Sequence, residues 1–177
     1  MKPPLDIIRI RTGDVDELPS TPGTAKLSMV ASPLGGTFGL VRSSGTKVHQ
    51  GWDLYAVPGT PFYAITEGVV EYTANQGDYG LQMCLRLNNA AVKEYARNKF
   101  IDQLYAFYGH LMFTFKHGGA LVAEGEQLGL TGNSGNATNT PPHLHFEIRT
   151  TPHPGLGLGG RINPEELFGQ QYYQCVK

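Results

Sequence analysis

The sequence predicts a single, mainly β domain made of antiparallel β-sheets with one inserted helix. Three observations lead to this fold class. The 177-residue chain contains 23 glycines and 12 prolines, which separate many short runs of Val, Ile, Leu, Tyr and Phe. Several of these runs alternate polar and apolar side chains, as half-buried strands do. A chain of this length also buries a sizeable core as one domain.

The charge balance excludes several classes of partner. Lysine plus arginine number 14 against 15 for aspartate plus glutamate, so we expect neither a nucleic-acid partner nor an anionic membrane surface.

No apolar run is long enough to span a bilayer. Cys84 and Cys175 lie in different segments, which excludes a zinc ribbon or a CxxC redox motif. The chain can hold either one disulfide or two free thiols.

The N-terminal part is expected to be an extension of the main domain. Residues 1–30 contain one run typical of an edge strand, residues 7–11, followed by polar, proline-containing loops. The main domain is predicted to cover residues 31–168, opening with a turn-rich segment. Residues 169–177 form a C-terminal tail.

The first half of the main domain is predicted to be a meander of short antiparallel strands. Along residues 52–56, Trp52, Leu54 and Ala56 are expected to face the core, with Asp53 and Tyr55 on the other side. The further elements are a hairpin turn at 57–61 and strands at 62–65, 68–73 and 81–87.

The second half interrupts the sheet with a helix. Residues 88–104 carry apolar side chains at helical spacing after an Asn-Asn start. A strand at 105–111, two short strands around a turn within 120–129, and a polar loop at 131–140 follow. In the last segment, Asn163 is expected to cap a helical turn with Pro164 as its first residue.

The strand that follows the polar loop carries the main chemical signal. In residues 143–148, His143, His145 and Glu147 share one face because side chains alternate along a strand. Imidazole is a common zinc ligand and also transfers protons, so this pair can supply one ligand and one acid–base group. For Glu147 the sequence favours a solvated strand-end carboxylate over a carboxylate that orients a ligand histidine.

A second cluster completes a candidate metal site. His49 and Asp53 are four residues apart, and Gly51 between them permits a tight bend, so both side chains can reach one ion. With one of the two strand histidines they make three N and O ligands. The fourth tetrahedral position then stays open for water, which is typical of catalytic zinc.

Three other features are interpreted as structural. Residues 155–160 match the spacing GxGxxG, but no strand precedes them, so we predict a flexible loop and no nucleotide site. His117 and His153 lie among Gly and Pro and are expected to be exposed. His110 alone, in an aromatic strand, is more typical of a packed histidine.

Taken together, the motifs resemble the lysostaphin-type zinc endopeptidases, the family of LytM and related cell-wall hydrolases. The resemblance spans roughly residues 30–168 and includes 125–129 and 162–164. It implies that His49, Asp53 and His145 bind zinc. It also implies that His143 is catalytic, together with the His110 of a Tyr-x-His-Leu segment.

The resemblance further implies hydrolysis of a peptide bond in peptidoglycan. Zinc lowers the pKa of its bound water from near 16 toward roughly 7 and polarises the scissile carbonyl. His143 then takes the proton of the water and passes it to the leaving amine, while His110 stabilises the oxyanion or shares the proton transfer. Substrate contacts are expected from Tyr79, Tyr108, Asn139 and Thr140.

Three departures from the family pattern concern the rim of the groove. The loop leading to His143 is longer and lacks a late glycine, a helix replaces a short turn near 88–104, and Leu81 stands where Asn often follows Tyr-Gly. We favour cleavage of stem-peptide cross-links between a D-amino acid and meso-diaminopimelate. Cleavage of glycine bridges, cleavage of proteins, and a non-catalytic peptidoglycan-binding or activator module are the competing hypotheses.

Such a substrate lies in the periplasm or cell wall. Since the first residues lack the apolar stretch of a Sec signal, we expect either a mature form without its signal peptide or export by another route. We favour an antibacterial effector delivered by a contractile secretion machine. That role implies an immunity protein in the producing cell.

Overall fold

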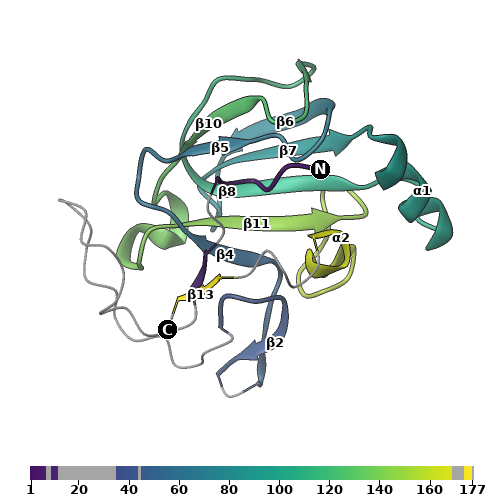
Figure 1. The fold of residues 1–177 in the computed structure, drawn as a ribbon. Helices are drawn as coiled ribbons and strands as arrows, with labels where there is room; N and C mark the ends of the chain where they lie inside the picture. The colour runs from purple at the N-terminus through teal and green to yellow at the C-terminus, as the bar shows by residue number, and fades with distance from the viewer. Residues whose placement is uncertain (7–8, 12–34, 44, 169–173, 177) are drawn as a thin grey trace.

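The computed structural model describes residues 1–6, 9–11, 35–43, 45–168 and 174–176, and it confirms a mainly β, antiparallel fold with few helices (Figure 1). The elements along the chain are β1 (Arg9–Arg11), β2 (Gly39–Arg42), β3 (Lys47–His49), β4 (Trp52–Tyr55), β5 (Pro61–Tyr63), β6 (Gly68–Asn75), β7 (Leu81–Leu87), α1 (Ala90–Asn98), β8 (Tyr105–Thr114), β9 (Leu121–Val122), β10 (Gln127–Thr131), the 3₁₀ helix η1 (Gly135–Asn139), β11 (His143–Arg149), β12 (Arg161–Ile162), α2 (Glu165–Phe168) and β13 (Gln174–Val176).

The main sheet runs in the order β13-β1-β4-β11-β8-β7-β6-β9, with β5, β10 and β12 joined at its sides. Strand β11 lies near its centre, between β4 and β8, and pairs antiparallel with both. In this register His145 lies opposite Asp53 on β4 and Gly109 on β8. The sheet therefore brings the two distant chemical clusters of the sequence side by side.

The hydrophobic core covers one face of this central strand. Leu144, Phe146 and Ile148 of β11 are fully buried, as the alternation predicted. Phe146 contacts Trp52 and Phe168, with ring centroids 6.3 and 6.0 Å apart. These contacts anchor β11 and β4 to each other, so the opposite face of β11 is presented on a rigid support.

Two predicted strand pairings are wrong. The turn at 57–61 joins strands that do not pair, because β4 pairs with β1 and β11 whereas β5 pairs with β10. The two strands within 120–131 also pair elsewhere: β9 with β6, and β10 with β5 and β8. Alternation along a strand reports which side chains share a face, but it carries no information on which strand is the neighbour.

The two helices confirm their predicted caps. The side chain of Asn89 accepts hydrogen bonds from the backbone N–H groups of Ala91 and Val92 and starts α1. Asn163 Oδ1 accepts from the N–H of Glu165 at 3.1 Å and starts α2. Helix α1 projects at the edge of the sheet in Figure 1, so the helical insertion lies apart from β4 and β11.

The predicted N-terminal strand is present as β1, but it is not an edge strand, because it pairs with β4 on one side and β13 on the other. Residues 7–8 and 12–30 lie outside the described part of the chain. The tail contributes β13, which pairs parallel with β1.

Cys84 is a free, buried thiol, and burial raises its pKa to about 12. Among the described residues, no helix is long and apolar enough to cross a membrane.

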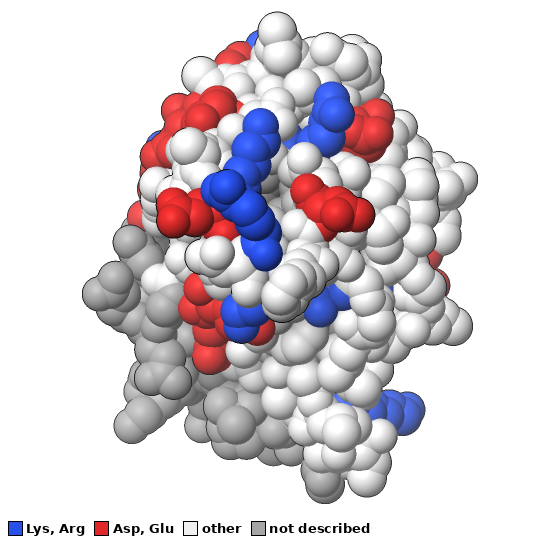
Figure 2. All heavy atoms as spheres, turned by 90° about the vertical axis from the view of Figure 1, so that its right-hand side faces the viewer, with Lys and Arg blue, Asp and Glu red and all other residues white. Residues whose placement is uncertain are grey.

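Charged side chains of both signs are interspersed on the molecular face shown in Figure 2. No continuous basic surface is visible on that face. This mixture of signs matches the near-neutral composition, with 14 lysines and arginines against 15 aspartates and glutamates.

Candidate metal centre and active site

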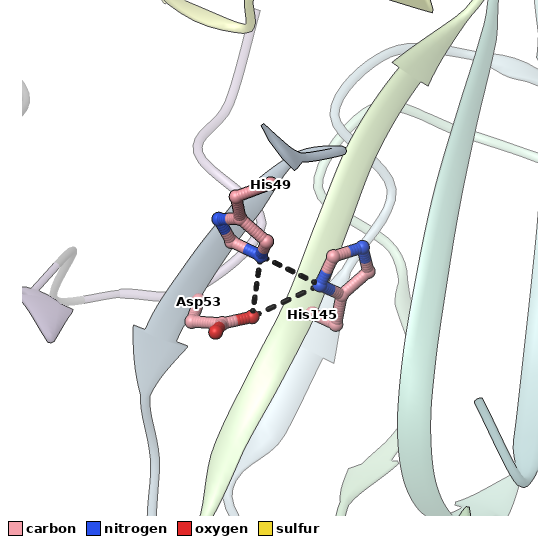
Figure 3. Close-up of side chains that lie close together, drawn as sticks. All are labelled: His49, Asp53 and His145. Atoms are coloured by element: carbon pink, nitrogen blue, oxygen red, sulfur yellow. Dashed lines mark hydrogen bonds and ion pairs between the residues drawn. The ribbon is translucent and has the colours of Figure 1, made fainter. Parts of the chain in front are cut away.

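Three side chains from distant parts of the sequence converge on one point (Figure 3). His49 Nε2 lies 3.2 Å from Asp53 Oδ1 and 3.4 Å from His145 Nδ1, and the last two atoms are 2.9 Å apart. All three residues are at most 5% exposed. Ligand atoms at the corners of a zinc tetrahedron with bonds of about 2.05 Å lie about 3.3 Å apart. The cluster therefore fits a zinc ion held by three protein ligands.

Each histidine of the cluster has its tautomer set by a second partner. The Nδ1–H of His49 donates to the carbonyl oxygen of Thr37 at 2.8 Å, so its Nε2 presents a lone pair to the cluster. His145 is turned the other way: its Nε2 lies 2.9 Å from Glu147 Oε1 and donates to it, so Nδ1 faces Asp53. Both rings are thereby oriented to bind a metal ion before one arrives.

Burial and neighbouring charges decide the ionisation of the three candidate ligands. Burial lowers the pKa of His49, which favours the neutral imidazole that binds metals. Burial opposes ionisation of Asp53, but His49, His143 and His145 outweigh it and hold its pKa well below the usual value. For His145, burial is outweighed by hydrogen bonds to Asp53 and Glu147, which raise its pKa. A metal ion at this nitrogen therefore competes with a proton.

Three consecutive carbonyl groups of the chain before β2 hold the centre in place. The oxygens of Gly35, Gly36 and Thr37 accept hydrogen bonds from Arg42 Nε, the Asp53 backbone N–H and His49 Nδ1 at 2.9, 2.9 and 2.8 Å. Arg42 also donates through Nη2 to Asp53 Oδ2, the second oxygen of the carboxylate whose Oδ1 lies in the cluster. A short irregular segment thus fixes two ligands and one arginine together.

Gly51 is needed for a different reason from the one the sequence suggested. Its φ lies outside the left-handed region, so conformational freedom is not what the position requires. A Cβ at this position would lie 2.2 Å from the carbonyl oxygen of Phe146 and 2.8 Å from Glu147 Cγ. Glycine therefore allows the chain before β4 to approach β11 closely, and this approach brings His49 to His145.

His143 lies at the edge of the ligand cluster. Its Nδ1–H donates to the carbonyl oxygen of Pro141 at 2.7 Å, so Nε2 is the basic nitrogen, and Nε2 lies 3.4 Å from Asp53 Oδ1. The rings of His143 and His110 are 4.8 Å apart between centroids. Two imidazoles thus stand next to the centre without belonging to the three-ligand cluster.

His110 reaches the site through a β-bulge. On β7, Leu81 pairs with Leu111 whereas Met83 pairs with Tyr108, so two residues of β8 oppose one residue of β7. His110 takes a left-handed backbone conformation, with φ of 60°, and its Nδ1–H donates to the Ser134 carbonyl oxygen at 2.9 Å. Bulges re-aim side chains beside active sites, and this one turns His110 toward His143.

The same bulge explains a wrong prediction. Tyr108, two residues before His110, was expected to contact substrate, but it is fully buried. Its ring packs against Phe62 and Phe146, with centroids 5.1 and 5.5 Å away, and its hydroxyl donates to the Tyr63 carbonyl oxygen. Residues two apart share a face only in a regular strand, and the extra residue at the bulge separates Tyr108 from His110.

Glu147 is also not the solvated carboxylate that the sequence favoured. It is fully buried and accepts hydrogen bonds from His145, Tyr79, Arg149 and Arg161 at 2.6 to 2.9 Å. Burial opposes its ionisation, but His145 and Arg149 outweigh burial and hold its pKa far below the usual value. The competing interpretation, a carboxylate that orients a ligand histidine, agrees with this geometry.

The centre opens into a pocket of about 510 Å³. All five predicted metal and catalytic residues line it, and so do Tyr79 and Thr140, two of the predicted substrate contacts. Asn139 is exposed and is absent from the lining, where Asn136 lies instead. His117 and His153 are exposed, as expected.

Arg42 and the glycine-rich loop at 155–160 are among the contributors to the pocket that sequence reasoning missed. Leu156 and Gly157 of that loop line the pocket, and the Gly157 oxygen accepts from Gln50 Nε2 at 3.1 Å. No spacing in the sequence pointed to either contact, because each depends on how distant loops fold over the sheet.

The fold and the three-residue cluster match those of the lysostaphin-type zinc metallopeptidases. The chain belongs to peptidase family M23, whose family model matches residues 47–164. The structure of LytU is similar, with a TM-score of 0.59 and 26% identity over 76% of this chain and 82% of that one. The catalytic domain of lysostaphin from Staphylococcus simulans shares the fold, with a TM-score of 0.55 and 24% identity over 75% and 87% of the two chains.

Two curated relatives have names that state an activity. The DD-carboxypeptidase/endopeptidase Mpg of Neisseria meningitidis serogroup B is 32% identical over 108 residues, 61% of this chain and 21% of that protein. The peptidoglycan DD-endopeptidase ShyC of Vibrio cholerae is 31% identical over 102 residues, 58% of this chain and 20% of that protein. The chain thus spans about a fifth of the length of these relatives.

Proposed function

We propose that this protein is a zinc endopeptidase that hydrolyses peptide cross-links of bacterial peptidoglycan, with the bond between a D-amino acid and meso-diaminopimelate as its substrate. One observation carries the proposal: His49, Asp53 and His145 form a three-ligand cluster, and His143 and His110 stand beside it in an open pocket. The names of the relatives Mpg and ShyC support the choice of bond.

The residues divide the chemistry as follows. Zinc, when bound by His49, Asp53 and His145, activates water and polarises a carbonyl group at neutral pH. The Nε2 atom of His143 accepts the proton of the attacking water and delivers it to the leaving amine nitrogen. The tautomer that Pro141 sets leaves this nitrogen as the base.

His110 acts from beside His143, whose ring centroid is 4.8 Å away. As its Nδ1–H is bound to the Ser134 oxygen, its Nε2 is the remaining nitrogen for the substrate. In the protonated form it donates to the developing oxyanion. Tyr79 and Thr140 line the same pocket and are the proposed contacts to the peptide backbone on either side of the scissile bond.

The decisive test is digestion of purified sacculi, followed by separation of the released muropeptides. The zinc-loaded protein is expected to convert cross-linked dimers into monomers, and His143→Ala serves as a control that retains the metal. An unchanged profile with zinc bound would support a non-catalytic module. Cleavage only of sacculi with glycine bridges would indicate a glycine-bridge endopeptidase, and cleavage only of proteins would indicate a zinc protease.

We further propose that the protein acts in the periplasm or cell wall, where this substrate lies. An antibacterial role is an additional prediction, which implies a neighbouring gene for a protein that binds and inhibits this one. Co-expression of that neighbour with the peptidase is expected to protect sacculi from digestion. No inhibition and no binding would remove the antibacterial role while leaving the peptidase unaffected.

A further inference from the structure

Arg42 carries a fixed positive charge into the pocket. Among the described residues that line the pocket, no other lysine or arginine is present. Its side chain is 39% exposed, although it touches the buried Asp53. The remaining charged residues of the lining are carboxylates and imidazoles. An anionic group of the substrate therefore has one natural place to bind, at the end of β2.

The guanidinium of Arg42 has donors to spare for such a group. Of its five N–H donors, the Nε–H binds the Gly35 oxygen, and one N–H of Nη2 binds Asp53 Oδ2. Both contacts fix the plane of the guanidinium. In the described part of the chain, no further contact of this side chain accounts for the other donors. The arginine is thus positioned in advance for a planar, two-bonded contact with a carboxylate.

Its place relative to the metal centre sets which substrate atom it can reach. Arg42 contacts Asp53 Oδ2, and Oδ1 of the same carboxylate belongs to the ligand cluster. Arg42 and the ligand cluster therefore contact the two oxygens of the same carboxylate, so the arginine lies next to the point where the scissile carbonyl must lie. A group three bonds from the carbonyl carbon is at most about 4 Å away from it. Arg42 can thus contact a substituent on the carbon that follows the scissile nitrogen.

Peptidoglycan cross-links differ at that carbon. When the scissile amine belongs to meso-diaminopimelate, the adjacent carbon carries a free carboxylate. When it belongs to lysine, that carbon is a methylene group and carries no carboxylate. In a glycine bridge, the corresponding carbonyl is part of the next amide and has no charge. A carboxylate at this position is therefore the chemical feature that separates the three substrate classes.

We infer that Arg42 binds this carboxylate and is a specificity-determining residue for cross-links to meso-diaminopimelate. The inference rests on the proposed function, since it assigns the substrate class of the same site. A charge-assisted, bidentate contact in a partly buried pocket strongly discriminates against a substrate that lacks the partner, because the arginine would lose its own hydration without compensation.

The test compares two purified muropeptide dimers cross-linked through meso-diaminopimelate. One has the carboxylate next to the scissile nitrogen free, and the other has it converted to the amide. The zinc-loaded wild type is expected to prefer the free acid by about tenfold or more in kcat/KM. Arg42→Gln should bring this ratio close to one, and Arg42→Lys should leave an intermediate ratio, since it keeps the charge but loses the fork.

Lys47→Gln is the matched control. Lys47 pairs with Arg42 across the β2–β3 hairpin, is exposed, and is absent from the pocket lining. The substitution therefore removes one positive charge from the same hairpin without changing the pocket. Its ratio is expected to equal that of the wild type. Zinc content is measured for each variant, because Arg42 also touches the ligand Asp53.

Each outcome decides the inference. Equal rates on both dimers in the wild type, or an unchanged ratio in Arg42→Gln, would overturn it. Loss of zinc in both Arg42→Gln and Arg42→Lys would also overturn it, by showing that Arg42 serves only to hold Asp53. If the wild type cleaves neither dimer and no sacculi, the proposed function falls together with this inference. Cleavage with an unchanged ratio removes this inference alone.

Discussion

The Nε2 atom of His145 donates a hydrogen bond to Oε1 of Glu147 over 2.9 Å, and this bond determines that the other ring nitrogen faces the metal centre. The same carboxylate accepts from Arg149 and Arg161 through its second oxygen, at 2.6 and 2.7 Å. The buried carboxylate of Glu147 thus orients the candidate ligand His145 and also provides the counter-charge for two buried arginines.

Replacement of this carboxylate should therefore weaken zinc binding and stability together. For Glu147→Gln we expect zinc affinity to fall about 10- to 100-fold, because the imidazole loses its charged partner. The free energy of unfolding of the metal-free protein should fall by about 3–5 kcal/mol, because Arg149 and Arg161 would then be buried without a counter-charge. Competition with a chelator and denaturant unfolding measure the two effects.

Glu126→Gln is the control for that experiment. Glu126 forms an ion pair with Lys116, and about a third of each side chain is exposed, so its loss should change stability by less than about 1 kcal/mol. An equal loss of unfolding free energy in Glu147→Gln and Glu126→Gln would contradict the role of Glu147 as the counter-charge of two buried arginines.

Substitutions of His143 and His145 should have different effects on the zinc content of the protein. His145→Ala removes a ligand atom of the three-atom cluster, so we expect no stoichiometric zinc in the purified protein. His143→Ala should retain zinc, because His143 lies outside that cluster, and should lose turnover on cross-linked dimers. Metal analysis of both variants checks the assignment, and equal zinc content in the two would refute it.

The backbone of His110 should carry strain that glycine relieves. His110 has φ of 60°, and a side chain with a Cβ pays about 1–2 kcal/mol in this region. His110→Gly is therefore expected to be more stable than His110→Ala by up to about 1 kcal/mol, while both bind zinc and lose turnover. Thermal or denaturant unfolding of the two variants measures the difference. Greater stability of the alanine variant would show that the bulge relaxes when the imidazole is removed.

Close approach of two backbones should make Gly51 sensitive to a single methyl group. In Gly51→Ala the Cβ would meet the Phe146 oxygen at 2.2 Å, so we expect a loss of about 1–3 kcal/mol or more in unfolding free energy, and weaker zinc binding as His49 moves. Gly159→Ala is the control, since a Cβ there has no atom within 4 Å. It should change stability by about 0.5 kcal/mol or less.

The parts of the site that the sequence predicted are those encoded by local spacing. The alternation in β11 correctly placed His143 and His145 opposite Leu144 and Phe146, because the strand is regular. The caps of both helices were also readable, since each depends on a side chain and a backbone N–H two residues later.

The parts that sequence reasoning missed depend on tertiary geometry. The bulge in β8 reverses the face relation between Tyr108 and His110, and Gly109 inside the strand pattern is the one residue that could have signalled it. Glu147 looked like a strand-end carboxylate because its partners Arg161 and Tyr79 come from other parts of the chain. Arg42 reaches the pocket only because residues 35–37 fold against β3 and β4.

The loop at 155–160 has a practical consequence for altering this peptidase. One nitrogen of Arg161, Nη1, binds the carbonyl oxygens of Gly155, Gly157 and Gly159 at 2.8, 3.0 and 3.3 Å. On the side of the loop these three bonds use main-chain oxygens, while the side chain of Leu156 is fully exposed and lines the pocket. A library of substitutions at this one position would vary one wall of the pocket and leave the loop anchored, which makes Leu156 a natural starting point for changing what the pocket binds.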